Sequence, residues 1–375
     1  MTRPSVIDLY CGIGGLSLGA VRAGFRLALA VDKEPVLLNM HKRNFPGFPH
    51  SDADVSQLSG DDLLKAANLS RGALAGLIGG SPCQGFSRIG KRDHKDERNT
   101  LFTRFFQLVA ELRPVFFVAE NVPGILDSRN NGLVARAKEK ARGVYKLLDP
   151  LVLDASDFGA PTVRKRVFFV GYLPDAVESL THEDFEQGKW SHKTTVKTAL
   201  AGLPHRLRDG WLDDESGWRT LRVKRRGKYW TKIYGDLPHG VGDEEAVARF
   251  QNDRLVSGCI TTMHTPKVKQ RFGLVAEGGV DYISRAQRLQ RNGQCPTLRA
   301  GTGPDRGSFQ ALRPIHYKEP RAITPREAAR LQGFPDWFRF DSTKWHAFRG
   351  IGNSVSPLVA EAIFKTIRQK LKQTN

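Results

Sequence analysis

The chain has 375 residues, of which 40% are hydrophobic, so we expect one large domain with a buried core and a smaller second domain. It contains no run of about 18 apolar residues that could span a membrane and no charged-then-apolar leader, so we expect a cytoplasmic protein. The formal net charge of +19 indicates a polyanionic partner, because clustered Lys and Arg displace counterions from phosphates; the charge alone does not distinguish DNA from RNA.

The first half of the chain alternates short apolar runs with amphipathic stretches. This pattern is typical of strands joined by crossover helices. We therefore expect an α/β fold with a doubly wound, mostly parallel sheet. The predicted strands are residues 6–10, 27–31, 74–79, 115–119, 150–154 and 167–171.

The first predicted strand leads into a glycine-rich turn that opens a helix. Gly12 and Gly14 allow a ligand to approach the backbone closely. The dinucleotide-binding fingerprint would need a third glycine where Ser17 stands, which counts against a nicotinamide or flavin cofactor. Asp32 ends the second strand and Asp54 follows further along, and two carboxylates at successive strand ends suit a nucleoside. The alternative is a tight turn beside two solvated acids.

The third predicted strand leads into residues 80–87, a loop shaped by proline and glycine that contains Cys83. The chain has four cysteines and no Cys-x-x-Cys pair, so neither a disulfide framework nor a metal site is expected. A lone cysteine is most often a small buried residue. The polar neighbours of Cys83 instead indicate that it lies in a loop. Because this loop follows a predicted strand, Cys83 is expected at the carboxyl end of the sheet, where open α/β sheets bind ligands. Phe86 stands where a zinc deaminase would need a second cysteine.

Apolar residues recur every three to four positions from Leu101 to Leu112, which predicts a helix that ends before Pro114. The next strand ends at Glu120 and Asn121. Because neighbouring strand ends line one crevice, we expect Glu120 to lie near the thiol loop. A nucleophilic thiol and a proton-donating carboxyl group would suit addition to an electron-poor ring. Taken alone, Glu120 could equally be a surface acid.

From about residue 173 the apolar periodicity fades and basic residues gather between positions 219 and 232. We predict a second domain here, residues 176–335, with irregular or β-rich structure. A helix signal returns at Thr324 and Glu327, which form a capping box, and Gly333 ends that helix. The apolar spacing after Pro357 predicts a final amphipathic helix. We expect this last segment, residues 336–375, to return to the sheet domain.

In this order, the segments resemble the DNA (cytosine-5)-methyltransferase family of the prokaryotic, single-chain type. The resemblance implies the fold of S-adenosylmethionine-dependent methyltransferases. It also implies that residues 1–175 form the catalytic and cofactor-binding domain and that residues from about 173 to 323 form a target recognition domain. The similarity covers nearly the whole chain and is carried by residues 8–15, 32, 54, 80–87, 98–101, 120–122, 164–166, 326–335 and 352–355.

The resemblance implies a mechanism for a cytosine that has been flipped out of duplex DNA. Cys83, as thiolate, would add to carbon 6 of the ring, while Glu120 protonates or hydrogen-bonds ring nitrogen 3. Pro82 would shape the loop, Asn121 would hold the geometry of the site, and Arg166 would contact the base or its phosphate. The enzyme is expected to be the modification enzyme of a restriction–modification system, with a separate endonuclease as a possible companion.

The cofactor implied by the resemblance is S-adenosylmethionine, the methyl donor, which leaves as S-adenosylhomocysteine. Three positions depart from the family pattern: Tyr10 replaces Phe, Ser81 replaces Pro or Phe, and Thr162 replaces a Gln that supports its segment. The residues implied to surround the cofactor are Tyr10, Gly12, Gly14, Asp32, Asp54, Leu101, Asn353 and Val355.

Double-stranded DNA is the partner implied by the resemblance, and we expect the protein to act as a monomer. The residues expected to bind DNA are Arg88, Arg164, Arg299 and Arg306. Residues 88–97 would close over the DNA, although a merely solvated loop is the alternative. Arg299 and Arg306 could read guanine edges or hold phosphates.

Three other functions compete with this interpretation. A subgroup of the family methylates transfer RNA, but the Cys-Phe-Thr signature typical of that subgroup is absent from this sequence. A catalytically silent DNA-binding protein would not need both Cys83 and Glu120. A nicotinamide oxidoreductase is disfavoured by Ser17 and by the strong positive charge.

Overall fold

The computed structural model describes residues 3–82, 98–207, 217–222, 226–300, 313–341 and 343–372, with the backbone alone for residues 98–100. The predictions for Cys83, Arg88 and Arg306 therefore lie outside the described residues. Within the described part, no helix combines the length and the apolar character that crossing a lipid bilayer requires.

The described residues form an eight-stranded sheet with the order β3-β2-β1-β4-β5-β8-β6, and β7 also pairs with β8. The five strands β3, β2, β1, β4 and β5 run parallel to one another, whereas β8 runs antiparallel to β5, β6 and β7. All six predicted strands and the mostly parallel α/β sheet are confirmed. The strands are β1 (Ser5–Leu9), β2 (Arg26–Val31), β3 (His50–Ser51), β4 (Leu74–Gly80), β5 (Phe116–Asn121), β6 (Lys146–Leu147), β7 (Leu151–Asp154) and β8 (Lys165–Tyr172).

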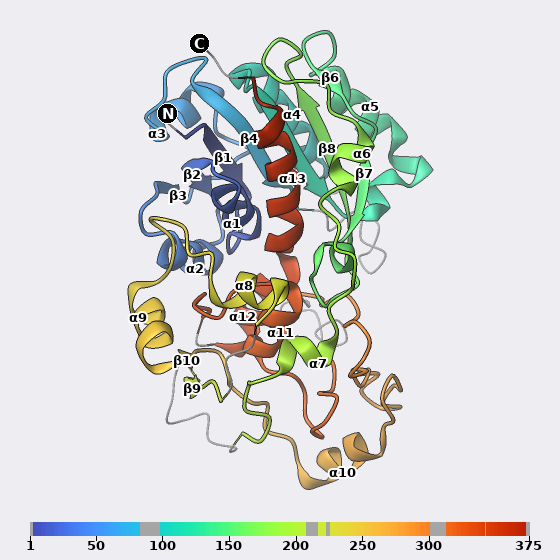
Figure 1. Ribbon diagram of the computed structural model, residues 1–375. Helices are drawn as coiled ribbons and strands as arrows, with labels where there is room; N and C mark the ends of the chain where they lie inside the picture. Colours follow the sequence, from blue (N-terminus) through green and yellow to red (C-terminus); the bar gives the residue numbers. More distant parts are fainter. Residues whose placement is uncertain are drawn as a thin grey trace.

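Helices cover both faces of the sheet, giving three layers (Figure 1). One face carries α1 (Gly15–Arg22), α2 (Pro35–Asn44) and α13 (Pro357–Lys370). The other face carries α3 (Gly60–Ala66), α4 (Arg98–Leu112) and α5 (Asn131–Glu139).

Each face is held by a core in which aromatic rings meet edge to face or tilted, the arrangements that their quadrupoles favour. Phe25 contacts Phe116 of β5 and Phe364 of α13 on the first face. Phe106 of α4 contacts Phe117 on the second face. The final helix predicted after Pro357 is therefore present and packs on the sheet domain.

The region between β8 and α11 consists of short helices joined by irregular segments. Its first residues, including 182–186, lie in the upper half of Figure 1, and the rest, here called the lower region, forms the lower part of the molecule. Its described strands are two residues long and pair only with each other. Of the two structures predicted for this region, the described residues therefore fit the irregular one. Its elements are α6 (His182–Glu186), α7 (Val196–Leu200), β9 (Arg219–Thr220), α8 (Lys228–Tyr234), α9 (Glu244–Asp253), β10 (Leu255–Val256) and α10 (Pro266–Leu274). Three short 3-10 turns, η1 (Pro123–Leu126), η2 (Ser128–Asn130) and η3 (Ala155–Phe158), belong to the sheet domain.

Helix α11 (Pro325–Gln332) begins with the predicted capping box, because Thr324 and Glu327 each accept a hydrogen bond from the backbone of the other. Gly333 ends the helix with a φ of 89°. Every residue of α11 is buried, including its charged ones. Arg330 forms an ion pair with Asp336, and its guanidinium also donates to backbone carbonyls near α7. Helix α12 (Lys344–Asn353) follows and packs against α11.

Candidate active site

The glycine turn after β1 is built against two other segments. The backbone N–H of Gly12 donates to Asp32 at 2.8 Å, and the second oxygen of Asp32 accepts from the backbone of Glu34. A Cβ at Gly15 would lie 2.2 Å from both the Ser354 hydroxyl and the Val355 carbonyl, so the turn and residues 354–355 are in close contact. At Gly12, by contrast, a Cβ would meet no atom of the described residues within 4 Å. The turn thus leaves open space beside a buried carboxylate.

Other predicted cofactor residues gather around this turn. Tyr10 has a φ of 57° and donates its hydroxyl to the backbone carbonyl of Leu101 at 3.3 Å, which joins the end of β1 to α4. Asp54 pairs with Lys33 at 2.8 Å, and this hydrogen bond holds the pKa of its carboxyl group below its usual value. Burial raises the pKa of Asp32, and the backbone donors of Glu34 and Gly12 oppose that shift. An aromatic ring, two carboxylates and a free backbone surface fit a nucleoside that carries a positive charge.

The acid predicted for catalysis lies beside the start of the thiol loop. Gly80 of β4 is opposite Glu120 of β5 in the parallel register, and a Cβ at Gly80 would lie 2.7 Å from the Glu120 carboxylate. Asn121 donates its side-chain amide to the Ser81 hydroxyl at 3.2 Å, and Pro82 follows, half-buried. The first two residues of the loop, Gly80 and Ser81, are therefore held against Glu120 and Asn121. Sequence reasoning assigned no role to Ser81, because its partner lies on another strand.

Glu120 is itself held by Arg166 from β8. The Arg166 Nε lies 2.9 Å from a Glu120 carboxylate oxygen, and both side chains are largely buried. Burial raises the pKa of Glu120, while the positive charges of Arg166 and Arg164 oppose the rise. The carboxyl group is thus poised to hold a proton more readily than an exposed glutamate. The predicted contact of Arg166 with the base or its phosphate stays a prediction.

The structure does not support the DNA contact predicted for Arg164. Its side chain is 2% exposed and donates to two backbone carbonyls, Leu298 at 3.0 Å and Gly352 at 2.7 Å. A guanidinium enclosed in this way cannot reach a phosphate on the surface. Thr162 is also buried, and its hydroxyl donates to the Cys295 carbonyl at 3.2 Å. Thr162 therefore links the segment before Arg164 to the backbone at Cys295. Arg299, by contrast, is exposed.

A buried polar chain under the glycine turn was not predicted. Ser17 donates to Asp8 at 2.5 Å and shares a hydrogen bond with His41, which in turn bonds His50 at 2.8 Å. Burial raises the pKa of Asp8 to about 7. The only signal in the sequence was Ser17 at a position where the helix pattern faces inward. Ser17 therefore provides a hydrogen bond to one of the two oxygens of Asp8.

The described cysteines are unsuited to act as nucleophiles. Cys11, Cys259 and Cys295 are free and buried. Burial raises the pKa of each thiol above its usual value, to about 12 for Cys259, so the reactive thiolate is disfavoured. Within the described ranges, no three His, Cys, Asp or Glu side chains are grouped so that they could hold a metal ion.

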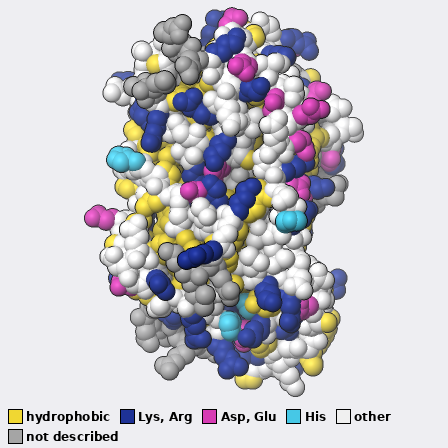
Figure 2. All heavy atoms as spheres, in the orientation of Figure 1, with side chains coloured by type: hydrophobic (Ala, Val, Ile, Leu, Met, Phe, Trp, Pro, Cys, Tyr) yellow, Lys and Arg dark blue, Asp and Glu magenta, His cyan; other side chains and the backbone are white. Residues whose placement is uncertain are grey.

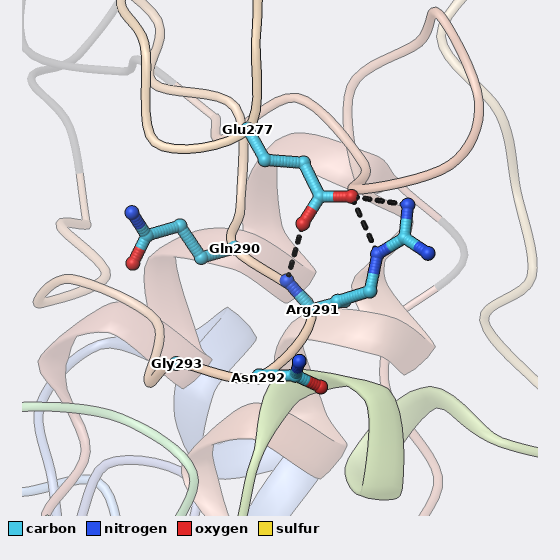
Figure 3. A pocket seen from close by; sticks show the side chains of 5 residues that line it. All are labelled: Glu277, Gln290, Arg291, Asn292 and Gly293. Atoms are coloured by element: carbon cyan, nitrogen blue, oxygen red, sulfur yellow. Dashed lines mark hydrogen bonds and ion pairs between the residues drawn. The ribbon is translucent and has the colours of Figure 1, made fainter.

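An open depression of about 460 Å³ lies away from this edge, in the lower region. It is lined by Glu277, Gln290, Arg291, Asn292 and Gly293. Figure 3 shows the Glu277 carboxylate paired with the Arg291 guanidinium and backbone, with Gln290 extending to the opposite side. The ionic groups of this depression already satisfy each other, so it is a feature of the surface separate from the Glu120 edge.

The sheet order, the glycine turn and the Glu120 edge define a class of protein: an open α/β enzyme that binds a nucleoside-containing cofactor at the carboxyl ends of its parallel strands. The comparisons give the family. The sequence profile of the C-5 cytosine-specific DNA methylase family matches residues 5–369. The chain belongs to this family, whose members are S-adenosylmethionine-dependent, and it is a DNA (cytosine-5)-methyltransferase.

Named relatives agree with this assignment. The chain is 40% identical to the Type II methyltransferase M.XorII of Xanthomonas oryzae pv. oryzae, over 100% of this chain and 86% of that protein. It is 28% identical to the Type II methyltransferase M.AgeI of Thalassovita gelatinovora, over 96% of this chain and 98% of that protein. A crystal structure described as a DNA modification methyltransferase encoded within a prophage (E. coli) superposes with a TM-score of 0.88 at 45% identity, covering 98% of this chain and 99% of that one.

Proposed function

We propose that this enzyme methylates carbon 5 of a cytosine that is flipped out of a specific duplex site, through a covalent adduct with Cys83. The supporting observation is the Glu120 carboxyl group, buried, paired with Arg166 and packed against Gly80 at the start of the thiol loop. As in its Type II relatives, the role is that of a modification enzyme in a restriction–modification system. A cognate endonuclease would act separately, and the methyltransferase would work as a monomer.

The chemistry needs a nucleophile and an acid on the same ring. The Cys83 thiolate adds to carbon 6 of cytosine while Glu120 donates a proton or hydrogen bond to nitrogen 3, so that electron density builds at carbon 5. Carbon 5 then takes the methyl group and loses its proton, and re-forming the double bond between carbons 5 and 6 expels the thiolate. Pro82 shapes the loop, Asn121 ties it to β5 through Ser81, and Arg166 orients Glu120.

S-adenosylmethionine, when bound, supplies an electrophilic methyl group on its sulfonium. The residues proposed to hold it gather at one edge of the sheet: the glycine turn contacts residues 354–355 and Asp32, and Tyr10 contacts Leu101. The carboxylates would accept hydrogen bonds from the ribose hydroxyls. The proposed cofactor residues are Tyr10, Gly12, Gly14, Asp32, Asp54, Leu101, Asn353 and Val355.

Double-stranded DNA would lie across the edge that carries Glu120 and Arg299. Figure 2 shows Lys and Arg side chains spread over the whole visible face of the molecule, including its lower part, as the net charge of +19 leads one to expect for a DNA-binding protein. We propose Arg299 as a DNA contact because its side chain is exposed. Arg88 and Arg306 stay proposed DNA contacts from the sequence alone.

The decisive experiment traps the adduct. Methylation-sensitive sequencing of DNA from cells that express the protein first gives the target site. A duplex with 5-fluorocytosine at that site cannot lose the substituent on carbon 5, so the wild-type enzyme should stay covalently attached to it. Cys83→Ser should abolish the attached product, while Cys259→Ala, which alters a buried thiol, should retain it. An undiminished yield with Cys83→Ser would show that another nucleophile acts, and absence of both methylation and adduct would refute the proposed function.

A further inference from the structure

Two segments far apart in the sequence meet at one buried arginine. Residues 298–300 belong to the lower region and include the exposed Arg299, whereas Gly352 lies near the end of α12, next to Asn353. Arg164 donates one guanidinium nitrogen to the Leu298 carbonyl at 3.0 Å and the other to the Gly352 carbonyl at 2.7 Å. Its planar fork therefore fixes the distance between these two backbone segments.

The same junction is tightly packed. A Cβ at Gly352 would lie 2.5 Å from the backbone nitrogen of Ala300, so α12 and residues 299–300 touch without any intervening side chain. Arg313 adds a second tie, because it donates to the Arg299 carbonyl at 2.8 Å while its guanidinium lies over the Phe348 ring of α12. A displacement of one segment therefore displaces the other.

Each of the joined segments leads to a different proposed ligand. Residues 354 and 355 pack against Gly15 in the glycine turn, where the cofactor would bind. Residues 298–300 present Arg299 to solvent, where DNA would bind. Arg164 also precedes by two residues the Arg166 that holds Glu120, and its own backbone N–H is fixed by Asp154 of β7.

We propose that Arg164 is a positioning residue that couples cofactor binding to DNA binding. This inference rests on the proposed function, since it assigns the cofactor to residues 353–355 and DNA to Arg299. When the 353–355 segment is fixed by bound cofactor, the two hydrogen bonds of Arg164 also fix residues 298–300. The Arg299 side chain is then held in the position in which it binds DNA. Linkage makes the effect reciprocal, so DNA must strengthen cofactor binding by the same factor.

The test measures the affinity for duplex DNA carrying the mapped site, with and without saturating S-adenosylhomocysteine, together with the affinity for S-adenosylhomocysteine alone. For the wild type, we expect S-adenosylhomocysteine to tighten DNA binding by about tenfold, within the usual range of coupling between two sites. The coupling ratio is the DNA affinity with S-adenosylhomocysteine divided by the DNA affinity without it. Arg164→Lys keeps the charge but lacks the planar fork, so this ratio should fall to less than about threefold. A residue that only stabilised the fold would weaken both ligands and leave the ratio unchanged.

Arg288→Lys is a matched control. Arg288 is another largely buried arginine that donates to several backbone carbonyls, including those of Phe272 and Val275, but it contacts neither of the joined segments. It should lower stability and leave the coupling ratio at the wild-type value. Should Arg164→Lys fail to fold, Gly352→Ala tests the same junction by forcing Ala300 away.

The outcomes separate the two proposals. A wild-type protein that binds neither S-adenosylhomocysteine nor DNA refutes the proposed function itself. A wild type that binds both, with a ratio near one, overturns the coupling inference alone. A ratio in Arg164→Lys, or in Gly352→Ala where that variant replaces it, equal to the wild-type ratio overturns it too.

Discussion

At the scale of single residues, the site depends on a carboxyl group whose protonation is set by its surroundings. Glu120 was predicted from the position of a strand end, but its control by Arg166 was not, because Arg166 comes from an antiparallel strand more than forty positions away. Burial favours the protonated acid and the nearby guanidinium favours the carboxylate. The balance between these two effects decides the pH range in which Glu120 can donate a proton.

Replacing Arg166 should move that range to higher pH. Arg166→Met removes the charge that holds the pKa of Glu120 down, so burial acts unopposed by its closest cation. Because the protonated acid is the active form, activity is lost as pH rises through the Glu120 pKa. The alkaline limb of the pH profile of kcat/KM should therefore move upward by about one pH unit or more, within a lower overall rate. Glu120→Gln, which cannot ionise, should show no such limb. An alkaline limb that is identical in wild type and Arg166→Met would contradict this assignment.

At the scale of elements, the sequence predicted what local spacing controls. Strands of four residues or more and the α4 and α13 helices were found, whereas β3 and β6, of two residues each, were too short to give an alternation. The start and end of α11 were predicted because Thr324, Glu327 and Gly333 act locally. The burial of its charged side chains was not predictable, since their partners come from α7 and from the segments after β10 and α11.

The contact between the glycine turn and residues 354–355 gives an element-scale prediction. Gly15→Ala would place a methyl group 2.2 Å from the Val355 carbonyl, and neither backbone can yield without moving the turn. We expect the dissociation constant for S-adenosylhomocysteine, measured by calorimetry, to rise at least tenfold while the protein stays folded. Gly132→Ala is the control, because a Cβ there would meet only the Arg136 side chain at 3.5 Å. Equal affinities for the two variants would show that this packing does not shape the cofactor site.

The capping box of α11 should make stability depend on acid. The Glu327 carboxylate is buried, and the charge of Arg321 together with nearby donors lowers its pKa to about 2 despite that burial. A lowered pKa contributes stability that is present above the unfolded value of about 4.5 and is lost as pH falls toward 2. The full contribution corresponds to about 3 kcal/mol.

Urea unfolding of wild type and Glu327→Gln at several pH values would measure this contribution. The wild type should be the more stable protein at pH 7, and the difference should shrink steadily below about pH 4.5. Burial lowers the pKa of His316 to about 4, and Glu327, 3.6 Å away, opposes that shift, so the difference between the two proteins reports on Glu327 together with its coupling to His316. A difference that stayed constant from pH 7 to pH 3 would show that Glu327 is not held ionised by Arg321.

At the scale of the whole molecule, one apolar core passes through the predicted border between the sheet domain and the second domain. It includes Phe364 of α13 and Leu331 of α11 as well as Leu203, which follows α7. The change in composition near residue 173 marks where the pattern changes, but spacing along the chain cannot report which distant surfaces pack together. The domain boundaries of 1–175, 176–335 and 336–375 therefore stay predictions. The Arg164 junction crosses the same border, which is why its contacts with Leu298 and Gly352 were not predicted from the sequence.

Because the net charge is +19, we expect DNA binding to depend strongly on salt concentration. Each phosphate that a cation neutralises adds about 0.9 to the slope of log affinity against log salt concentration. The side chain of Arg299 is exposed, and its backbone carbonyl is held by a hydrogen bond from Arg313. We expect the Arg299 guanidinium to bind a phosphate. Arg299→Ala should therefore lower the slope by about one and weaken all duplexes alike, without changing the methylated site. Arg142→Ala, which removes another exposed charge, just after α5 and outside the segments proposed to bind DNA, should leave the slope unchanged. If Arg299→Ala instead kept the slope and relaxed the choice of site, Arg299 would read a base edge, and the bidentate contact between arginine and guanine would be the first to examine.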